Sequence, residues 1–206
     1  RVERVQIEGE RVVGVEAGGV IHRAEVYILA VPLKAAQSLV PQLGLKALES
    51  SPITGIYLAF DRPVLDVPQA ALLDRTIQWA FSKEQGAAVQ IVVSASRSLL
   101  RAPREEIVRQ AVGELAEFFP AVGGAHLKDA HVIKEANATF TPRPGLAWRR
   151  PPATTRFHNL FLAGDWTRTG WPATMEGAVR SGYLAAEAAT AALGNPRKFL
   201  IPDATP

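Results

Sequence analysis

The sequence predicts an α/β (α+β) fold, in which a partial α/β domain carries an insert built from a mixed sheet plus a helix. Two apolar runs, residues 26–31 and 159–163, are each followed by a helix-like stretch, which is typical of alternating strands and helices. Between them the chain reads as several strands with one amphipathic helix, at residues 103–119. We therefore expect a discontinuous domain at residues 1–50 and 155–193, an insert at residues 51–154, and a tail at residues 194–206.

The first fifty residues read as a meander that leads into a buried strand. Strand-like alternation begins at Val2, and turn signals at Gly9-Glu10 and Gly18-Gly19 separate three short strands. The run at residues 26–31 is continuously apolar, as expected for a strand that is covered on both faces. Pro32 follows at a position where a first-turn proline can open a helix.

The middle of the chain has a different pattern. Strands are expected at residues 53–60, 78–81, 88–93 and 130–140. In the helix at residues 103–119, Pro103 and two glutamates occupy the first turn, where negative charge favours the helix dipole. The apolar side chains of this helix are expected on one face: Ile107, Val108, Ala111, Val112, Leu115, Phe118 and Phe119. This face should pack against the strands of the insert.

Composition narrows the class of protein. The 206 residues are 48% hydrophobic and 21% charged, which is ordinary for a globular chain with a core. The net charge is only +3 and the basic residues are scattered, so a nucleic-acid-binding surface is not indicated. There is no cysteine, which excludes disulfides and thiolate metal sites, and the four histidines lack metal-ligand spacing. No apolar run reaches the ~20 residues of a membrane span, and we expect a cytoplasmic location.

The most informative stretch is FLAGDWTRTGWPATMEGAVRSG, residues 161–182. An apolar strand ends at Gly164-Asp165, and a helix begins after Thr174. Glycine permits close approach to the backbone, and a carboxylate accepts hydrogen bonds from hydroxyl groups. The helix start offers unsatisfied amides, and Gly177, Ser181 and Ala185 leave one helix face almost bare. Two interpretations stay open: these features contact a ligand, or Asp165 is a loop acid and the bare face packs on a sheet.

Residues 159–188 resemble the carboxy-terminal flavin-binding signature of the FAD-dependent amine oxidase and phytoene (carotenoid) desaturase superfamily. Residues 1–40 are similar to the same superfamily's meander and Ala-Val-Pro segment. In finer detail, residues 51–64 and 78–83 look like the squalene-associated desaturases, the hydroxysqualene dehydroxylases of bacterial hopanoid synthesis. The resemblance implies the carboxy-terminal part of an FAD-binding domain with a substrate-domain-like insert. It also implies reductive removal of a hydroxyl from a C30 isoprenoid, with phytoene-type desaturation or amine oxidation as alternatives.

The resemblance also implies site residues. Asp165 would bind the ribityl or nearby ribose-phosphate part of FAD, and Gly164 would give the cofactor clearance. At the start of the last helix, the amide of Met175 and its neighbour Thr174 would face the N1/C2-oxygen edge of the isoalloxazine. That edge becomes negative on reduction, so a helix amino terminus there stabilises the reduced cofactor. Val2 would contact the adenine through its backbone.

Two tryptophans and two departures from the family pattern bear on the substrate. Trp166 and Trp171 would stack on the flavin or line the substrate mouth, or else anchor the loop. Amine oxidases of the superfamily have an aromatic residue where this chain has Thr174, and a lysine where it has residues 53–56. Both departures favour an apolar, isoprenoid-like substrate over an amine. No catalytic side chain is assigned.

A larger departure is the lack of a G-x-G-x-x-G motif, which the superfamily needs for the FAD pyrophosphate. Gly18-Gly19 and Gly123-Gly124 read as plain turns. We therefore expect an incomplete FAD site, and an isolated chain that is inactive. The alternative is that the chain is not itself an enzyme but a truncated or split half of one, which needs a dinucleotide-binding partner or self-associates. Peripheral contact with the inner face of the membrane is also expected, because squalene-like substrates partition into lipid.

Overall fold

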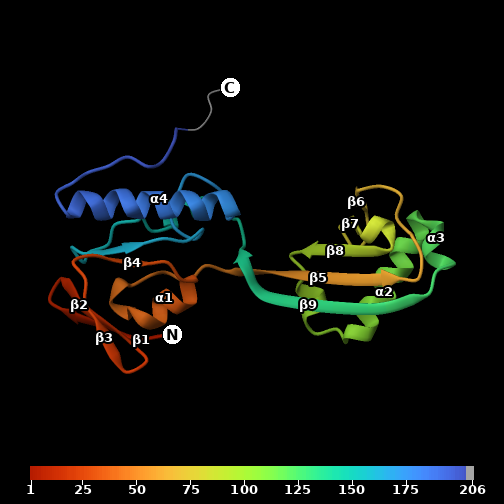
Figure 1. Cartoon of the computed structure of the whole chain (residues 1–206), viewed down its shortest axis with the longest axis horizontal. Helices are drawn as coiled ribbons and strands as arrows, with labels where there is room; N and C mark the ends of the chain where they lie inside the picture. The colour runs from red at the N-terminus through yellow and green to blue at the C-terminus, as the bar shows by residue number, and fades with distance from the viewer. Residues whose placement is uncertain (203–206) are drawn as a thin grey trace. The chain divides into compact units, whose positions relative to one another are not determined.

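The computed structural model describes residues 1–202, which form two compact units (Figure 1). The first unit contains Arg1–Leu48 and the described residues from Pro142 onward, and the second contains Glu49–Thr141. Each unit combines a sheet with helices, which confirms the α/β (α+β) class. The assignment of one unit to the cofactor and the other to the substrate stays a prediction.

The first unit holds an antiparallel meander, a short parallel sheet and two α-helices. The meander consists of β1 (Val2–Glu8), β2 (Arg11–Ala17) and β3 (Val20–His22), in that spatial order. The parallel sheet pairs β4 (Tyr27–Leu29) with β10 (Leu160–Leu162). The helical segments are α1 (Leu33–Leu39), α4 (Met175–Ala192) and 3-10 turns at Pro41–Leu43 and Leu146–Arg149. The predicted meander is confirmed, and both apolar runs form strands shorter than expected.

Helix α4 lies along the parallel sheet (Figure 1). Four small residues of this helix are buried, Gly177, Ser181, Ala185 and Ala189, and Gly177 among them lies against the Pro172 carbonyl of the preceding loop. Ala185 and Ala189 pack with Phe161 and Ala163 of the strand end. The bare face therefore brings the helix close to its own sheet, as one of the two sequence interpretations required. In the described part of the chain, no helix combines the length and apolar character needed to cross a bilayer.

One carboxylate holds the segment that follows α4. The backbone amides of Phe199 and Leu200 donate to Oε1 of Glu187 at 2.8 and 2.9 Å, and Lys198 Nζ lies 3.2 Å from Oε2. These amides, with the Lys198 charge, hold the pKa of Glu187 below its ordinary value. The segment is thereby tied back to the helix at a single side chain.

Acid should release this segment before it unfolds the unit. Because the pKa of Glu187 is lowered in the folded state, its ionised carboxylate stabilises the docked segment at pH values above the ordinary glutamate pKa. This contribution is lost as the pH falls below about 4.3. We expect faster amide hydrogen exchange at Phe199 and Leu200 on acidification, after correction for the intrinsic pH dependence, with Ala185 and Ala189 protected. In Glu187→Gln the two amides should exchange fast at every pH. Unchanged protection in that variant would contradict the assignment.

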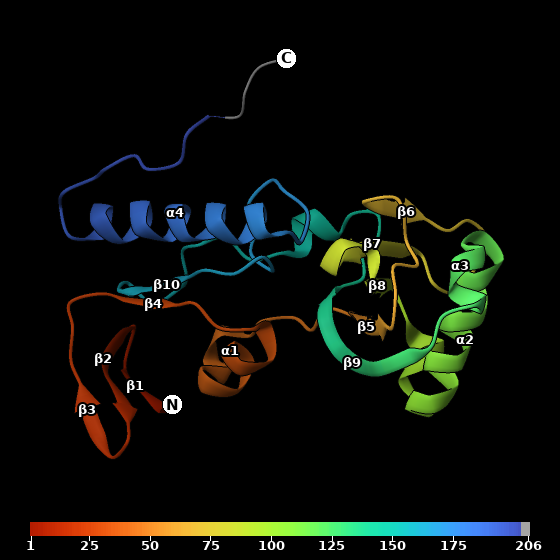
Figure 2. The same ribbon diagram turned by 45° about the vertical axis from the view of Figure 1, so that its right-hand side comes forward.

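The second unit is a five-stranded sheet with a helical layer (Figure 2). Its strands are β5 (Ser50–Phe60), β6 (Gln69–Ala71), β7 (Trp79–Lys83), β8 (Ala88–Ser94) and β9 (Leu127–Phe140). The helical segments are α2 (Arg104–Phe118), α3 (Pro120–Gly123) and 3-10 turns at Glu84–Gly86 and Arg97–Leu100. In the order β6-β7-β8-β5-β9 every pairing is antiparallel, whereas we expected a mixed sheet. Short hairpin-like connections account for the β6-β7 and β7-β8 pairs, because parallel neighbours would need long crossovers.

The core of the second unit lies between α2 and one face of this sheet. Ile107, Ala111 and Leu115 of α2 are fully buried and pack among Ile56 and Ile91 of the sheet. Each fully buried leucine or isoleucine contributes about 1.5–3 kcal/mol relative to an exposed one. The core thus fixes which face of α2 meets the sheet.

Three details of the second unit differ from the sequence prediction. Phe118 was expected on the buried face but is 45% exposed, and the Arg75 guanidinium packs over its ring at 5.6 Å. Pro103 is the N-cap residue of α2 and precedes its first turn. Strand β9 starts at Leu127 rather than residue 130, because β5 offers it a pairing partner along nearly its whole length.

Candidate functional site

The predicted site residues gather around the 164–174 loop, which joins β10 to α4. Gly164 has a φ of +148°, a region that side chains rarely enter. A Cβ there would collide with Nε1 of Trp166, so the space beside this glycine is filled by the protein's own indole. The Gly164 amide donates to Ser181 Oγ at 2.7 Å, which ties the loop start to α4.

Trp166 anchors the loop from inside. Its side chain is only 4% exposed, and Nε1 donates to the Val31 carbonyl at 2.9 Å. Thr167 donates to the Gly164 carbonyl through both its amide and its hydroxyl. These contacts make the first half of the loop a rigid turn on top of the parallel sheet.

The Asp165 carboxylate, unlike the Trp166 side chain, is not held by contacts within the loop. The residue is half-buried, and within residues 1–202 its side-chain oxygens accept no hydrogen bond. Its backbone carbonyl accepts from Arg150 Nη2 at 2.6 Å. Burial lowers the pKa of Arg150, and the negative charge of Asp165 opposes that shift. A carboxylate acceptor without a protein donor fits a ligand that carries hydroxyl groups, such as the ribityl chain of a flavin cofactor.

The start of α4 is the second half of the predicted site. Thr174 Oγ1 accepts from the Gly177 amide at 3.1 Å and caps the helix. In the described part of the chain, the amides of Met175 and Glu176 have no acceptor, as is normal for a first helical turn. Met175 is 89% exposed. The helix therefore offers amide donors and its positive dipole end to an electron-rich group, which fits the flavin edge.

The structure separates the remaining predicted residues. Trp171 follows in the same loop and is 37% exposed, so it offers an accessible ring where Trp166 does not. Val2 lies at the start of β1, opposite Ala17, in a different sheet from β10. Gly164, Asp165, Thr174 and Met175 thus form one group, and Val2 is not part of it.

Arg150 was not predicted from the sequence. This residue follows the turn Leu146–Arg149 and is only 5% exposed, yet it donates to three acceptors of the 164–174 loop. Only its place beside Pro151-Pro152, in an irregular connection, distinguishes it in the sequence. No spacing rule points from an arginine there to a loop some fifteen residues later.

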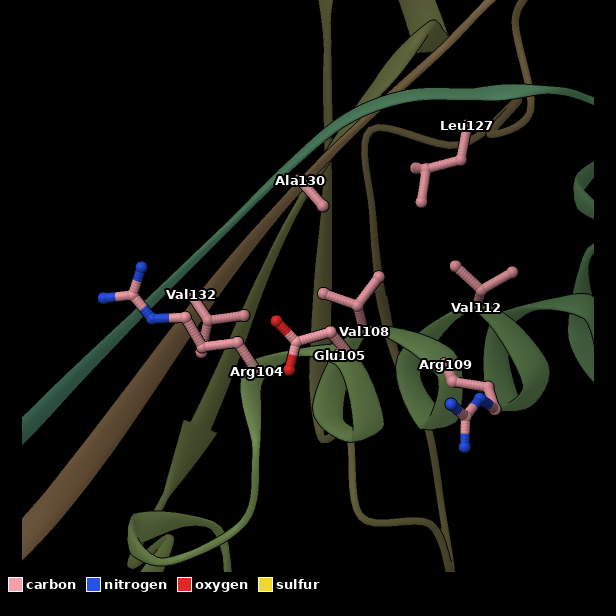
Figure 3. A pocket seen from close by; sticks show the side chains of 8 residues that line it. All are labelled: Arg104, Glu105, Val108, Arg109, Val112, Leu127, Ala130 and Val132. Carbon is pink, nitrogen blue, oxygen red and sulfur yellow. The ribbon is translucent and has the colours of Figure 1, made fainter.

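The second unit contains a cavity of about 590 Å³ between α2 and β9 (Figure 3). Figure 3 shows Val108 and Val112 of the helix facing Leu127 and Ala130 of the strand, with charged side chains of α2 at the rim. None of the predicted site residues lines it. Among residues 1–202 no group of three or more histidine and acidic side chains could hold a metal ion.

Known proteins resemble this chain over most of its length. A hydroxysqualene dehydroxylase of Sinorhizobium fredii (strain NBRC 101917 / NGR234) is 39% identical over 168 residues, covering 80% of this chain and 38% of that protein. The Rhodopseudomonas palustris (strain ATCC BAA-98 / CGA009) hydroxysqualene dehydroxylase is 33% identical over 189 residues, covering 89% and 44%. A 15-cis-phytoene desaturase of an Oncidium hybrid cultivar is more distant, 27% identical over 214 residues, covering 91% and 37%.

A solved structure shares the fold. Cyclohexylamine oxidase from Brevibacterium oxydans IH-35A superposes with a TM-score of 0.59 at 15% identity, over 93% of this chain and 48% of that one. The chain spans less than half the length of the curated relatives it matches. The family described as flavin containing amine oxidoreductase matches residues 1–190. The family resemblance of residues 159–188 is therefore confirmed, and this chain belongs to the flavin containing amine oxidoreductase family.

Proposed function

We propose that the protein containing these residues is an FAD-dependent oxidoreductase that converts hydroxysqualene, a C30 isoprenoid, to squalene in hopanoid synthesis. The similarity to two hydroxysqualene dehydroxylases, over 80% and 89% of the chain, carries this proposal. Because those relatives are more than twice as long, we assign the activity to the whole protein rather than to residues 1–206 alone.

The first unit would hold one half of the cofactor. Asp165 would accept a hydrogen bond from a ribityl or ribose hydroxyl, since its carboxylate has no protein donor within residues 1–202. The amide of Met175, positioned by the Thr174 cap, would face the N1/C2-oxygen edge of the isoalloxazine. Gly164, whose lack of a side chain leaves room for the Trp166 indole, would support the loop that carries Asp165. Val2 would lie near the adenine. When bound, the reduced cofactor would supply the hydride that replaces the substrate hydroxyl, which would take up a proton and leave as water.

The substrate side favours an apolar molecule. Trp171 offers an accessible ring, whereas Trp166 supports the loop from below. Thr174 stands where amine oxidases carry an aromatic residue, and residues 53–56 contain no lysine, so amine oxidation is the weaker candidate. Phytoene-type desaturation is the stronger alternative, because a phytoene desaturase also matches 91% of the chain. Such substrates partition into lipid, and we place the enzyme in the cytoplasm with peripheral contact at the inner membrane face.

The pyrophosphate half of the site would come from a dinucleotide-binding segment. Residues 1–206 contain no G-x-G-x-x-G motif, so this segment lies elsewhere in the polypeptide or in a second chain. Met175, Val179 and Tyr183 form an exposed apolar stripe at four-residue spacing on α4. Residues 1–206 alone would bind FAD weakly, would be inactive, and could self-associate through this stripe.

The test joins residues 1–206 to the G-x-G-x-x-G segment of a hydroxysqualene dehydroxylase relative; we call this the completed form. After anaerobic reduction it should convert hydroxysqualene to squalene, detected by mass spectrometry. Desaturation of phytoene by the oxidised completed form, with no conversion of hydroxysqualene by the reduced form, would support the desaturase alternative, and no bound flavin would overturn the proposal.

Asp165→Asn in the completed form should weaken FAD binding about 10- to 100-fold, because a hydrogen bond to a charged acceptor contributes about 1.5–3 kcal/mol. Fluorescence titration of FAD measures this. Asp129→Asn, a matched change of an exposed carboxylate on β9, should leave the dissociation constant unchanged. Equal affinities of Asp165→Asn and the parent protein would remove Asp165 from the site.

A further inference from the structure

Arg150 is a buried cation that donates hydrogen bonds to the polar groups of one loop. It is 5% exposed, and a guanidinium taken out of water must be compensated by hydrogen bonds. Nη1 donates to the Trp171 carbonyl at 2.5 Å, and Nη2 donates to the Asp165 carbonyl at 2.6 Å. Nη2 also donates to Thr169 Oγ1 at 3.2 Å. The planar guanidinium thereby joins both ends of the segment 165–171.

Thr169 extends this network inside the loop. Its Oγ1 also accepts from the Trp171 amide at 3.2 Å, and the residue is 7% exposed. The hydroxyl therefore links the guanidinium to the backbone just before the helix start. Loss of either partner would leave buried polar groups without their bonds.

A second cation acts on the ring of Trp171. The Arg180 guanidinium, from α4, lies 5.4 Å from the ring centroid, within the range of cation–π interactions. Arg180 is 9% exposed and its Nη1 lies 3.7 Å from Glu176 Oε1. Trp171 is thus held at its backbone by Arg150 and at its ring by the helix.

We propose that Arg150 is a positioning residue that holds the 165–171 segment in its binding conformation, so that the Asp165 carboxylate and the Trp171 ring are already in place when flavin and substrate bind. This inference rests on the proposed function for what is bound, but the arrangement itself belongs to the chain alone. Lysine cannot replace Arg150, because one ammonium on a flexible stem lacks the fixed fork that reaches both carbonyls.

The first experiment uses residues 1–206 without cofactor. In Arg150→Lys, amide hydrogen exchange across residues 165–171 should accelerate at least tenfold, while exchange at Ala185, Ala189 and the strands of the second unit changes less than twofold. Arg149→Lys, an exposed neighbour, is the matched control and should leave all rates unchanged. Unchanged exchange in Arg150→Lys, or equal acceleration throughout the first unit, would overturn a positioning role.

If Arg150→Lys does not fold, a pair of variants at Thr169 tests whether the hydrogen-bond network orders the 165–171 segment. Thr169→Val keeps the shape but removes the hydroxyl, and should accelerate exchange at Trp171 and Asp165. Thr169→Ser restores the hydroxyl and should restore slow exchange. Equal rates in these two variants would overturn the proposed network.

The second experiment uses the completed form. Arg150→Lys should raise the FAD dissociation constant at least tenfold, with the flavin absorption band altered by the mobile loop. If the parent completed form binds no FAD, the proposed function fails, whereas the hydrogen-exchange result on residues 1–206 still decides the role of Arg150. Normal FAD affinity in Arg150→Lys, despite a mobile loop, would refute the link between loop order and binding.

Discussion

Gly177→Ala is expected to destabilise the first unit by about 1–3 kcal/mol, the usual cost of overpacking a well-packed site. A Cβ at this position would collide with the Pro172 carbonyl oxygen. The obstacle is backbone rather than a flexible side chain, so the end of the 164–174 loop must move away from α4. The change should also disturb the helix cap, because Thr174 Oγ1 accepts from the Gly177 amide.

Gly182→Ala is the matched control on the same helix. A Cβ added at Gly182 would have no atom within 4 Å, so the alanine methyl enters open space. Alanine is the better helix former, and this variant should be more stable by about 0.5–1 kcal/mol. Thermal or chemical unfolding, followed by tryptophan fluorescence in a Trp79→Phe background that leaves tryptophans in the first unit alone, reports the first unit. Changes of the same sign in the two variants would contradict the packing described for α4.

Leu115→Ala should destabilise the second unit by about 2–5 kcal/mol, because truncation removes apolar contacts and leaves a cavity. Leu115 is fully buried between α2 and the sheet. Native-state hydrogen exchange of β5 and β8, measured at Ile56 and Ile91, isolates this unit from the other. We expect a lower opening free energy there, with Ala185 and Ala189 of α4 unaffected.

Phe118→Ala provides the comparison for Leu115→Ala. It removes a larger side chain from the same helix, but Phe118 is 45% exposed. The expected loss is below about 1 kcal/mol, mainly from the contact with the Arg75 guanidinium. A loss as large as that of Leu115→Ala would mean that α2 presents a different face to the sheet.

Local periodicity predicted most of the regular elements. The apolar run at residues 159–163 and the small-residue pattern after Thr174 correspond to β10 and α4, because burial on both faces and close helix packing leave direct marks on composition. Strand direction left no such mark: the alternation in β5 is the same whether its neighbours run parallel or antiparallel. The strand β6 was also missed, since its residues Gln69–Ala71 include no β-branched or aromatic side chain that indicates a strand.

The sequence predicted which residues form the candidate site, and that assignment stays a prediction, but it did not predict the contacts within the loop. The sequence predicted Gly164 beside a ligand, and the structure places the Trp166 indole in that space. Arg150 could not be found in this way, because its three acceptors lie 15 to 21 residues away along an irregular connection. Hydrogen bonds made by loops depend on the path of the backbone, and no repeat in the sequence encodes that path.

The sequence by itself determined the family, through residues 159–188, and the class of fold, because both depend on side-chain patterns that are local along the chain. Only the tertiary structure decided that the bare face of α4 packs on its own sheet and that Trp166 is an internal anchor. It alone placed the charge of Arg150 beneath the 164–174 loop. These outcomes depend on contacts between residues distant in sequence, where burial and hydrogen bonding select one of several arrangements that the local pattern allows equally.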